Sequence, residues 1–138
     1  MKISFTIDGD PIAQKRHRHH RWGVYDPSAK DKKATKLIIH KHIPQSLLRG
    51  AIVLHLHFFC KRPKYHYRTG KYSHLINDKH KLVFKTSKPD IDNLVKYYMD
   101  CMTNMIWEDD CQIVQLSCSK KYADTNPCLL YTSPSPRD

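Results

Sequence analysis

Acidic residues are scarce in this 138-residue sequence, which contains 13 Asp and Glu against 24 Lys and Arg. The formal net charge is +11, and the basic residues are clustered rather than spread evenly. Clustered Lys and Arg indicate a polyanionic partner, because cationic side chains that neutralise phosphates release condensed counterions. The alternative, a generally basic soluble protein, accounts less well for the clustering.

The sequence also lacks any run of about 18 apolar residues, so it contains no predicted membrane-spanning helix. Its N-terminal residues, MKISFTIDGD, alternate like a strand and do not resemble a secretion signal. The five cysteines include no C-x-x-C pair, which is typical of reduced thiols used in packing. We therefore expect a cytoplasmic protein with no membrane partner.

The C-terminal residues differ in character from the rest of the chain, whose length otherwise favours one domain. Residues 128–138, CLLYTSPSPRD, match the translation of a sequencing-library adapter. We predict a folded domain over residues 1–127 and a non-native tail over 128–138. A genuine Ser/Pro-rich disordered tail is the alternative.

Hydrophobic periodicity predicts most of the secondary structure. Alternation of apolar and polar residues predicts strands at 3–7, 52–59 and 111–122, and apolar residues on both sides of 52–59 favour a central strand. Apolar positions at helical spacing predict helices at 27–42 and 91–106, the first with Ala34, Leu37 and Ile38 on one face. Asp26 is its expected N-cap.

Two basic segments are the expected DNA contacts. Residues 14–22, QKRHRHHRW, are predicted to form a loop, and residues 61–88 a long basic and aromatic loop with a hairpin near 82–84. The second segment has nine Lys and Arg, only Asp78 as an acid, and aromatic residues that can stack on unpaired bases. The predicted DNA-binding residues are Lys15, Arg16, Arg18, Arg21, Lys61, Arg62, Lys64, Arg68 and Lys88.

Aspartates occur at two places that can form a metal site. Asp90 and Asp92 flank the start of the second helix, and Asp109 and Asp110 lie in the turn WEDD before the last strand. Magnesium takes hard oxygen ligands, and two or three carboxylates with a substrate phosphate are sufficient to bind it. An N-cap aspartate and a polar turn are the alternative reading, and spacing alone leaves both open.

The strings KPDIDNLVK and MIWEDDCQIVQLSCSKKYADTNP closely resemble the RusA family of Holliday junction resolvases. Three further strings, QKRHR, YDPSAK and FFCKRPK, resemble the family's first basic loop, first helix entry and second strand. The resemblance extends nearly to Pro127, where the adapter-like tail replaces the family's last strand. It implies that Asp90, Asp92 and Asp110 are metal-binding catalytic acids and that Lys96 is the catalytic lysine.

The resemblance also implies an α+β fold, with a small mixed β-sheet and two main helices packed on it in a single domain. It implies a homodimeric endodeoxyribonuclease that requires Mg²⁺, which Mn²⁺ can replace. The expected substrate is a Holliday junction or related branched DNA, cut in paired positions during recombination and repair. The expected host is a bacterium, or a phage in a bacterial host.

Three other interpretations were weighed. A PD-(D/E)xK nuclease has its first element in Pro89-Asp90, but no strand after it carries the second. A non-catalytic nucleic-acid-binding module would use the basic aromatic loop alone. A zinc site would draw on histidines, but no recognised tetrahedral spacing is present; the histidines considered are His17, His19, His20, His55 and His57.

Overall fold

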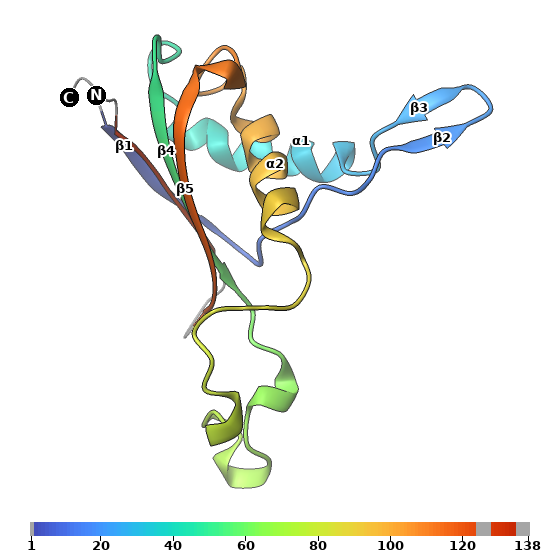
Figure 1. Cartoon of the computed structure of the whole chain (residues 1–138), viewed down its shortest axis with the longest axis vertical. Coiled ribbons are helices and arrows are strands. Elements are labelled where there is room, and N and C mark those ends of the chain that lie inside the picture. Colours follow the sequence, from blue (N-terminus) through green and yellow to red (C-terminus); the bar gives the residue numbers. More distant parts are fainter. Residues whose placement is uncertain (1, 124–127, 135–138) are drawn as a thin grey trace.

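The computed structural model describes residues 2–123 and 128–134 (Figure 1). Four strands form a mixed sheet in the order β1 (Lys2–Asp8), β6 (Cys128–Pro134), β4 (Ile52–Cys60) and β5 (Ile113–Tyr122). Strand β6 is antiparallel to both of its neighbours, whereas β4 and β5 are parallel. With helices α1 (Ala29–Ile39) and α2 (Ile91–Met102), this confirms the α+β fold expected from the sequence.

Strand β4 is the centre of the hydrophobic core. Its alternate residues Ile52, Leu54, Leu56 and Phe58 are at most 2% exposed, and the residues between them are half-buried. Helix α2 supplies the opposite side of the core with its own buried face. Both helices lie on the same side of the sheet (Figure 1), so the alternating pattern of β4 reflects one covered face and one more open face.

The segment predicted to be a non-native tail contributes a strand. Residues Cys128–Pro134 form β6 between β1 and β4, and Leu129 is 1% exposed within the core. The sequence analysis expected the family's last strand to be absent here, but the described sheet has a strand at this place. The pairing has a simple cause, because an open gap between β1 and β4 would leave their backbone groups unpaired. The non-native origin of residues 128–138 stays a prediction from sequence.

Helix α1 begins later and buries a different face than predicted. Its N-cap is Ser28, whose backbone N–H donates to the Asp26 carboxylate at 2.9 Å. Thr35 and Ile39 are buried, whereas Leu37 is 74% exposed. The prediction that Ala34, Leu37 and Ile38 face the core was wrong, because polar contacts to α2 orient the helix: the Thr35 hydroxyl lies 2.8 Å from the Tyr97 hydroxyl.

Helix α2 ends four residues before the predicted limit of residue 106. The Thr103 hydroxyl donates to the Met99 carbonyl at 2.8 Å, and Asn104 has a φ of 68°. Asparagine tolerates this left-handed conformation better than most residues, so it ends the helix. The chain then turns through buried Ile106 and Trp107 towards β5.

The two basic segments project from this core (Figure 1). The first is not the predicted loop, because β2 (Arg18–His20) and β3 (Gly23–Tyr25) form an antiparallel hairpin. The second, residues 61–88, is called the basic insert here and contains three short 3₁₀ turns: η2 (Lys64–His66), η3 (Gly70–Tyr72) and η4 (Asp78–His80). Instead of a local hairpin at 82–84, Phe84 bridges to Lys121 on β5. No helix among the described residues is long and apolar enough to cross a membrane.

Candidate active site

The first pair of candidate aspartates lies at the start of α2. Asp90 is the N-cap residue with an extended backbone, and its exposed carboxylate lies 3.3 Å from the Lys88 ammonium. Asp92 lies in the first turn, where one carboxylate oxygen accepts the Asn93 N–H at 2.9 Å. Acidic side chains are favourable at a helix N-terminus, so both positions favour an aspartate.

Strand β5 holds the approach to this helix in place. The Lys120 ammonium donates to the Ser87 carbonyl at 2.8 Å and to the Pro89 carbonyl at 2.7 Å. Lys120 therefore fixes the backbone just before Asp90 to the edge strand of the sheet. Lys120 is one of many cations in this basic protein, but both of these contacts are with backbone carbonyls of the chain itself, so they are structural.

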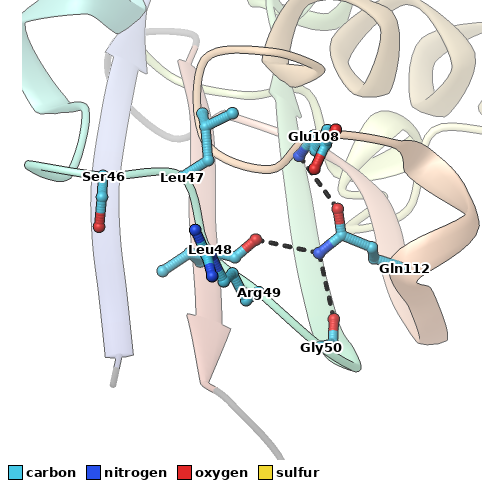
Figure 2. Close-up of a pocket in the computed structure, with 7 residues that line it drawn as sticks. All are labelled: Ser46, Leu47, Leu48, Arg49, Gly50, Glu108 and Gln112. Carbon is cyan, nitrogen blue, oxygen red and sulfur yellow. Dashed lines mark hydrogen bonds between the residues drawn. The ribbon is translucent and has the colours of Figure 1, made fainter.

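The second pair of aspartates lies in the turn before β5, which Gln112 holds by four hydrogen bonds. Figure 2 shows those to Leu48, Gly50 and Glu108. The Gln112 amide nitrogen donates to the Leu48 carbonyl at 3.0 Å and to the Gly50 carbonyl at 3.2 Å. Its amide oxygen accepts the backbone N–H groups of Glu108 and Asp109, both at 3.0 Å. Gln112 thus ties the turn to the segment that leads into β4.

A hollow of about 460 Å³ adjoins this Gln112 junction, and Figure 2 shows the residues that line it. Its lining includes only one acidic residue, Glu108. The Asp109 carboxylate completes the local structure by accepting the Cys111 N–H at 3.0 Å, which closes a capping box over η5 (Asp110–Gln112). Asp110 is therefore presented from a short helical turn whose ends are both hydrogen-bonded.

Helix α2 and strand β5 enclose a groove of about 450 Å³ in which the candidate residues meet. Asp92, Lys96 and Asp110 all line this α2–β5 groove, and Asp90 is the one predicted catalytic residue outside its lining. Apolar side chains form much of the remainder: Ile91, Val95, Met99, Leu116 and Cys118. The arrangement places carboxylates and one ammonium group around a partly apolar surface.

Asp100 is a fourth acidic residue of interest, and the sequence interpretation missed it. It lines the α2–β5 groove together with Asp92 and Lys96. These three residues are spaced at i, i+4 and i+8, which is one face of a helix. That spacing was a usable signal, but the sequence interpretation considered only the aspartates at the helix start and in the WEDD turn.

The electrostatic environment differs between the adjacent aspartates of the turn. Burial, the neighbouring Asp109 and the charge of Asp100 together raise the pKa of Asp110. Hydrogen bonds from Cys111 lower the pKa of Asp109. The proton therefore resides more readily on Asp110, the member of the pair that lines the groove.

Asp100 is also part of a half-buried polar network that joins α2 to α1. The Lys32 ammonium donates to Asp26 at 2.8 Å and to Asp100 at 3.2 Å. Burial opposes ionisation of Asp26, but hydrogen bonds from Lys32, Ser28 and Gln14 outweigh it and lower its pKa to about 2. The same two carboxylates raise the pKa of Lys32 against the opposing effect of burial.

The first basic segment lies beside the catalytic helix. The Gln14 N–H donates to the Asn93 carbonyl at 2.9 Å, which brings the next residues against the first turn of α2. A second hollow, of about 660 Å³, is lined by Lys15 and Arg16 and also by Lys96. Because Lys96 lines both this basic hollow and the α2–β5 groove, it lies at the boundary between them.

The other predicted DNA-binding residues divide into exposed and buried ones. All of them except Arg62 are exposed: Lys15, Arg16, Arg18, Arg21, Lys61, Lys64, Arg68 and Lys88. Arg62 is 6% exposed, and its guanidinium donates to the carbonyls of His80 at 3.0 Å and Leu82 at 2.9 Å. The structure thus gives Arg62 a role inside the basic insert.

The donor groups suit a hard cation in kind, but they do not gather as one set. Among residues 2–123 and 128–134, no group of three or more His, Cys, Asp or Glu side chains is close enough to hold a metal ion. The histidines of the alternative zinc site fall into two groups, one in or beside β2 and one on β4, and His57 contacts Ser119 at 2.8 Å. The metal-binding role of Asp90, Asp92 and Asp110 stays a prediction from the resemblance.

Comparison with known proteins identifies the family of the chain. Residues 8–129 match the family model described as Endodeoxyribonuclease RusA. The chain is also 30% identical, over 128 residues, to "Uncharacterized protein YqaN" of Bacillus subtilis (strain 168), a similarity that spans 88% of this chain and 89% of that protein. The family match includes all the candidate aspartates and Lys96. The chain belongs to the RusA family of endodeoxyribonucleases.

Proposed function

We propose that this protein is a structure-selective endonuclease that resolves Holliday junctions or related branched DNA. The observation that carries the proposal is the α2–β5 groove, which brings Asp92, Lys96, Asp100 and Asp110 together in a chain of charge +11. Carboxylates beside a phosphate-binding surface would repel DNA unless a cation offset their charge. Membership of an endodeoxyribonuclease family supports the same chemistry.

The proposed catalytic residues are Asp90, Asp92, Asp110 and Lys96, as the resemblance implies. Lys96 lies at the boundary between the basic hollow and the groove, where its ammonium can stabilise negative charge that develops on a phosphate. Exposed Lys15 and Arg16 flank it and orient the DNA backbone. The apolar floor of the groove reduces the number of waters that compete at the reacting phosphate.

A divalent cation, Mg²⁺ or Mn²⁺, is part of this proposal. The aspartates offer the hard oxygens that Mg²⁺ prefers, and Mg²⁺ usually keeps several waters and needs only one or two carboxylates besides the substrate phosphate. Bound there, the ion would activate the attacking water and offset charge on the leaving oxygen. Because no three-carboxylate group is present among the described residues, no ligand geometry is assigned.

The working unit we propose is a homodimer acting in recombination and repair. A four-way junction has two-fold symmetry, and paired cuts require two active sites. The chain offers one α2–β5 groove. Two copies related by a two-fold axis, the commonest symmetry of soluble homo-oligomers, would provide the pair.

A cleavage assay tests this function directly. Immobile four-way junctions and linear duplexes of matched sequence are incubated with the protein in Mg²⁺, in Mn²⁺ and in EDTA. We expect paired nicks in the junction with either metal, little cutting of the duplex, and no cutting in EDTA. Equal cutting of both substrates would contradict structure selectivity, and absence of metal-dependent cutting would contradict the nuclease itself.

The homodimer has its own test. Light scattering at several concentrations gives the mass, and active protein is mixed with the Asp90→Asn variant. A dimer predicts junctions nicked on one strand only when the variant is in excess. A monomer that makes both cuts at a non-associating concentration would refute the dimer.

A further inference from the structure

The basic insert contains a hollow that the proposed nuclease chemistry does not use. Its volume is about 890 Å³, within the range of roughly 300–1,000 Å³ that is usual for small-molecule sites. The insert projects from one end of the sheet (Figure 1), and the hollow shares no lining residue with the α2–β5 groove. The residues that line it are Lys64, Tyr65, Tyr67, Arg68, Thr69, Gly70, Ser73, Asn77, Lys79 and His80.

Buried Arg62 holds the two arms of the insert together beneath this hollow. Its guanidinium donates to the His80 and Leu82 carbonyls and lies 4.7 Å from the centre of the Tyr122 ring on β5. These contacts link the beginning of the insert, its end and the sheet. The insert is therefore supported by a buried, hydrogen-bonded charge, which indicates a defined shape.

The backbone of the insert is paired as well. The Asn77 N–H donates to the His66 carbonyl at 2.7 Å, and the Arg68 N–H donates to the Leu75 carbonyl at 2.8 Å. The His66 and His80 rings stack with their centres 4.8 Å apart and their planes 4° from parallel. The walls of the hollow are thus formed before any ligand binds, which lowers the entropic cost of binding.

The chemistry of the lining combines aromatic rings with cations. Tyr65 is 69% exposed. The plane of its ring is nearly perpendicular to the rings of His66 and His80, with interplanar angles of 84° and 81°. Exposed Lys64, Arg68 and Lys79 also line the hollow, and no carboxylate does. The acid of the insert, Asp78, is outside the lining and lies 2.8 Å from Lys81 and 4.0 Å from Arg68.

We propose that this insert pocket binds an unpaired nucleotide of single-stranded DNA, with its base against Tyr65 and the flanking phosphates on Lys64, Arg68 and Lys79. Base–aromatic stacking beside a positively charged track is the usual way in which proteins hold single strands. An apolar peptide would satisfy the rings but not the cations, so charge complementarity favours DNA. The proposal rests on the proposed function, because it gives the nuclease a preference for branches that carry an unpaired arm.

Direct binding in EDTA tests the pocket without any cleavage. The full chain is titrated by fluorescence anisotropy into a labelled oligo(dT), a duplex with the same number of phosphates, and an oligo(U), all at one salt concentration. We expect Tyr65→Leu to weaken oligo(dT) binding roughly ten-fold and to leave duplex binding nearly unchanged. Tyr65→Phe keeps the aromatic face and should retain tight binding.

Matched controls come from the same insert. Tyr72 is 48% exposed on η3 but does not line the pocket, and Lys71 beside it is outside the lining too. Tyr72→Leu should leave oligo(dT) binding unchanged, and Lys71→Gln should weaken it less than Arg68→Gln does. Thermal unfolding of each variant shows that the fold is intact.

Three results would overturn the pocket: equal losses from Tyr65→Leu and Tyr72→Leu, equal losses of single-strand and duplex binding, or no loss at all. Tighter binding of oligo(U) than of oligo(dT) would assign the pocket to RNA and reject DNA. Failure of the pocket is distinguishable from failure of the nuclease. If the pocket assignment fails, Tyr65→Leu binds oligo(dT) in EDTA as tightly as the wild type does, and junction cleavage persists. If the nuclease assignment fails, the wild type binds oligo(dT) but does not cleave junctions.

Discussion

The α2–β5 groove and the basic insert are built in opposite ways. The groove lies between a helix with a fully buried face and an edge strand, and hydrogen bonds from Gln112 and Lys120 hold both of its acidic ends. The insert projects from the sheet and displays exposed cations around a small frame centred on Arg62. Catalysis needs groups held within fractions of an ångström, whereas charge attraction tolerates looser positioning.

That contrast gives different expectations for substitutions in the two regions. Changes in the groove should remove the reaction and leave affinity largely intact. Changes in the insert should reduce affinity and leave the chemical step intact. Substitutions in each region therefore test whether loss of the reaction and loss of affinity are separate.

The largest effect is expected from the catalytic residues themselves. Asp90→Asn, Asp92→Asn, Asp110→Asn and Lys96→Ala should each reduce cleavage of a four-way junction roughly a hundred-fold or more, because each removes a charge from the reacting centre. Junction affinity of the three aspartate variants should be retained or improved, since a carboxylate that repels phosphate has been neutralised. Single-turnover cleavage and a gel-shift titration measure the two quantities. Full activity in any one of these variants would remove that residue from the site.

Gln112 is expected to be the most important positioning residue. Gln112→Ala removes four hydrogen bonds that hold the turn before Asp110, so kcat should fall roughly ten- to a hundred-fold with a much smaller change in KM. Gln112→Glu keeps the acceptor but loses the donors to Leu48 and Gly50, and should give an intermediate loss. A general loss of folding would instead lower the fraction of active protein at unchanged kcat per active site, which active-site titration would reveal.

The hydrogen bonds that Asp26 accepts from Lys32, Ser28 and Gln14 predict a pH-dependent contribution to stability. The pKa of Asp26 is about 2 in the folded protein against an ordinary value of 3.8, so its stabilisation is complete above pH 4 and is lost as pH falls towards 2. Asp26→Asn should therefore lower the free energy of unfolding by about 2 kcal/mol near neutral pH. Denaturant unfolding at neutral pH and near pH 2 measures it, and a difference between the two proteins that persists undiminished in acid would contradict the assignment.

Within the insert, Arg62 and Lys64 should separate folding from binding. Arg62→Gln leaves the carbonyls of His80 and Leu82 without their donor and should destabilise the insert by roughly 1–3 kcal/mol, seen as faster amide exchange there. Lys64→Gln should leave exchange unchanged and reduce the slope of DNA affinity against salt by about one phosphate contact. Equal effects of the two substitutions on both measurements would remove the distinction between a buried and an exposed cation.

The sequence predicted the groove residues better than it predicted what holds them. Strand β4 and the start of α2 followed from periodicity, because their apolar faces are buried on the core. Strand β5 followed from its alternation, although its apolar residues Val114 and Leu116 are exposed. The hydrogen bonds of Gln112 and Lys120 join segments far apart in sequence, and no local pattern encodes them. Strand β6 was missed because its residues were assigned to a tail by their match to an adapter sequence, whereas sheet closure depends on the unpaired edges of β1 and β4.

The smallest effect is expected at Asp109, the neighbour of Asp110. Its carboxylate lies outside the lining of the α2–β5 groove and accepts the Cys111 N–H, a bond that an asparagine amide oxygen can also accept. Asp109→Asn should therefore keep the capping box and change kcat/KM on a junction by no more than about three-fold, within the range of a surface substitution.

Asp109→Ala removes the cap as well and should resemble a weak form of Gln112→Ala, with a lower kcat at little-changed affinity. The comparison with Asp110→Asn is decisive. The two residues are adjacent in sequence, but only Asp110 lines the groove. An Asp109→Asn variant as inactive as Asp110→Asn would mean that the turn presents both carboxylates to the substrate. The division between a catalytic and a structural aspartate would then have to be abandoned.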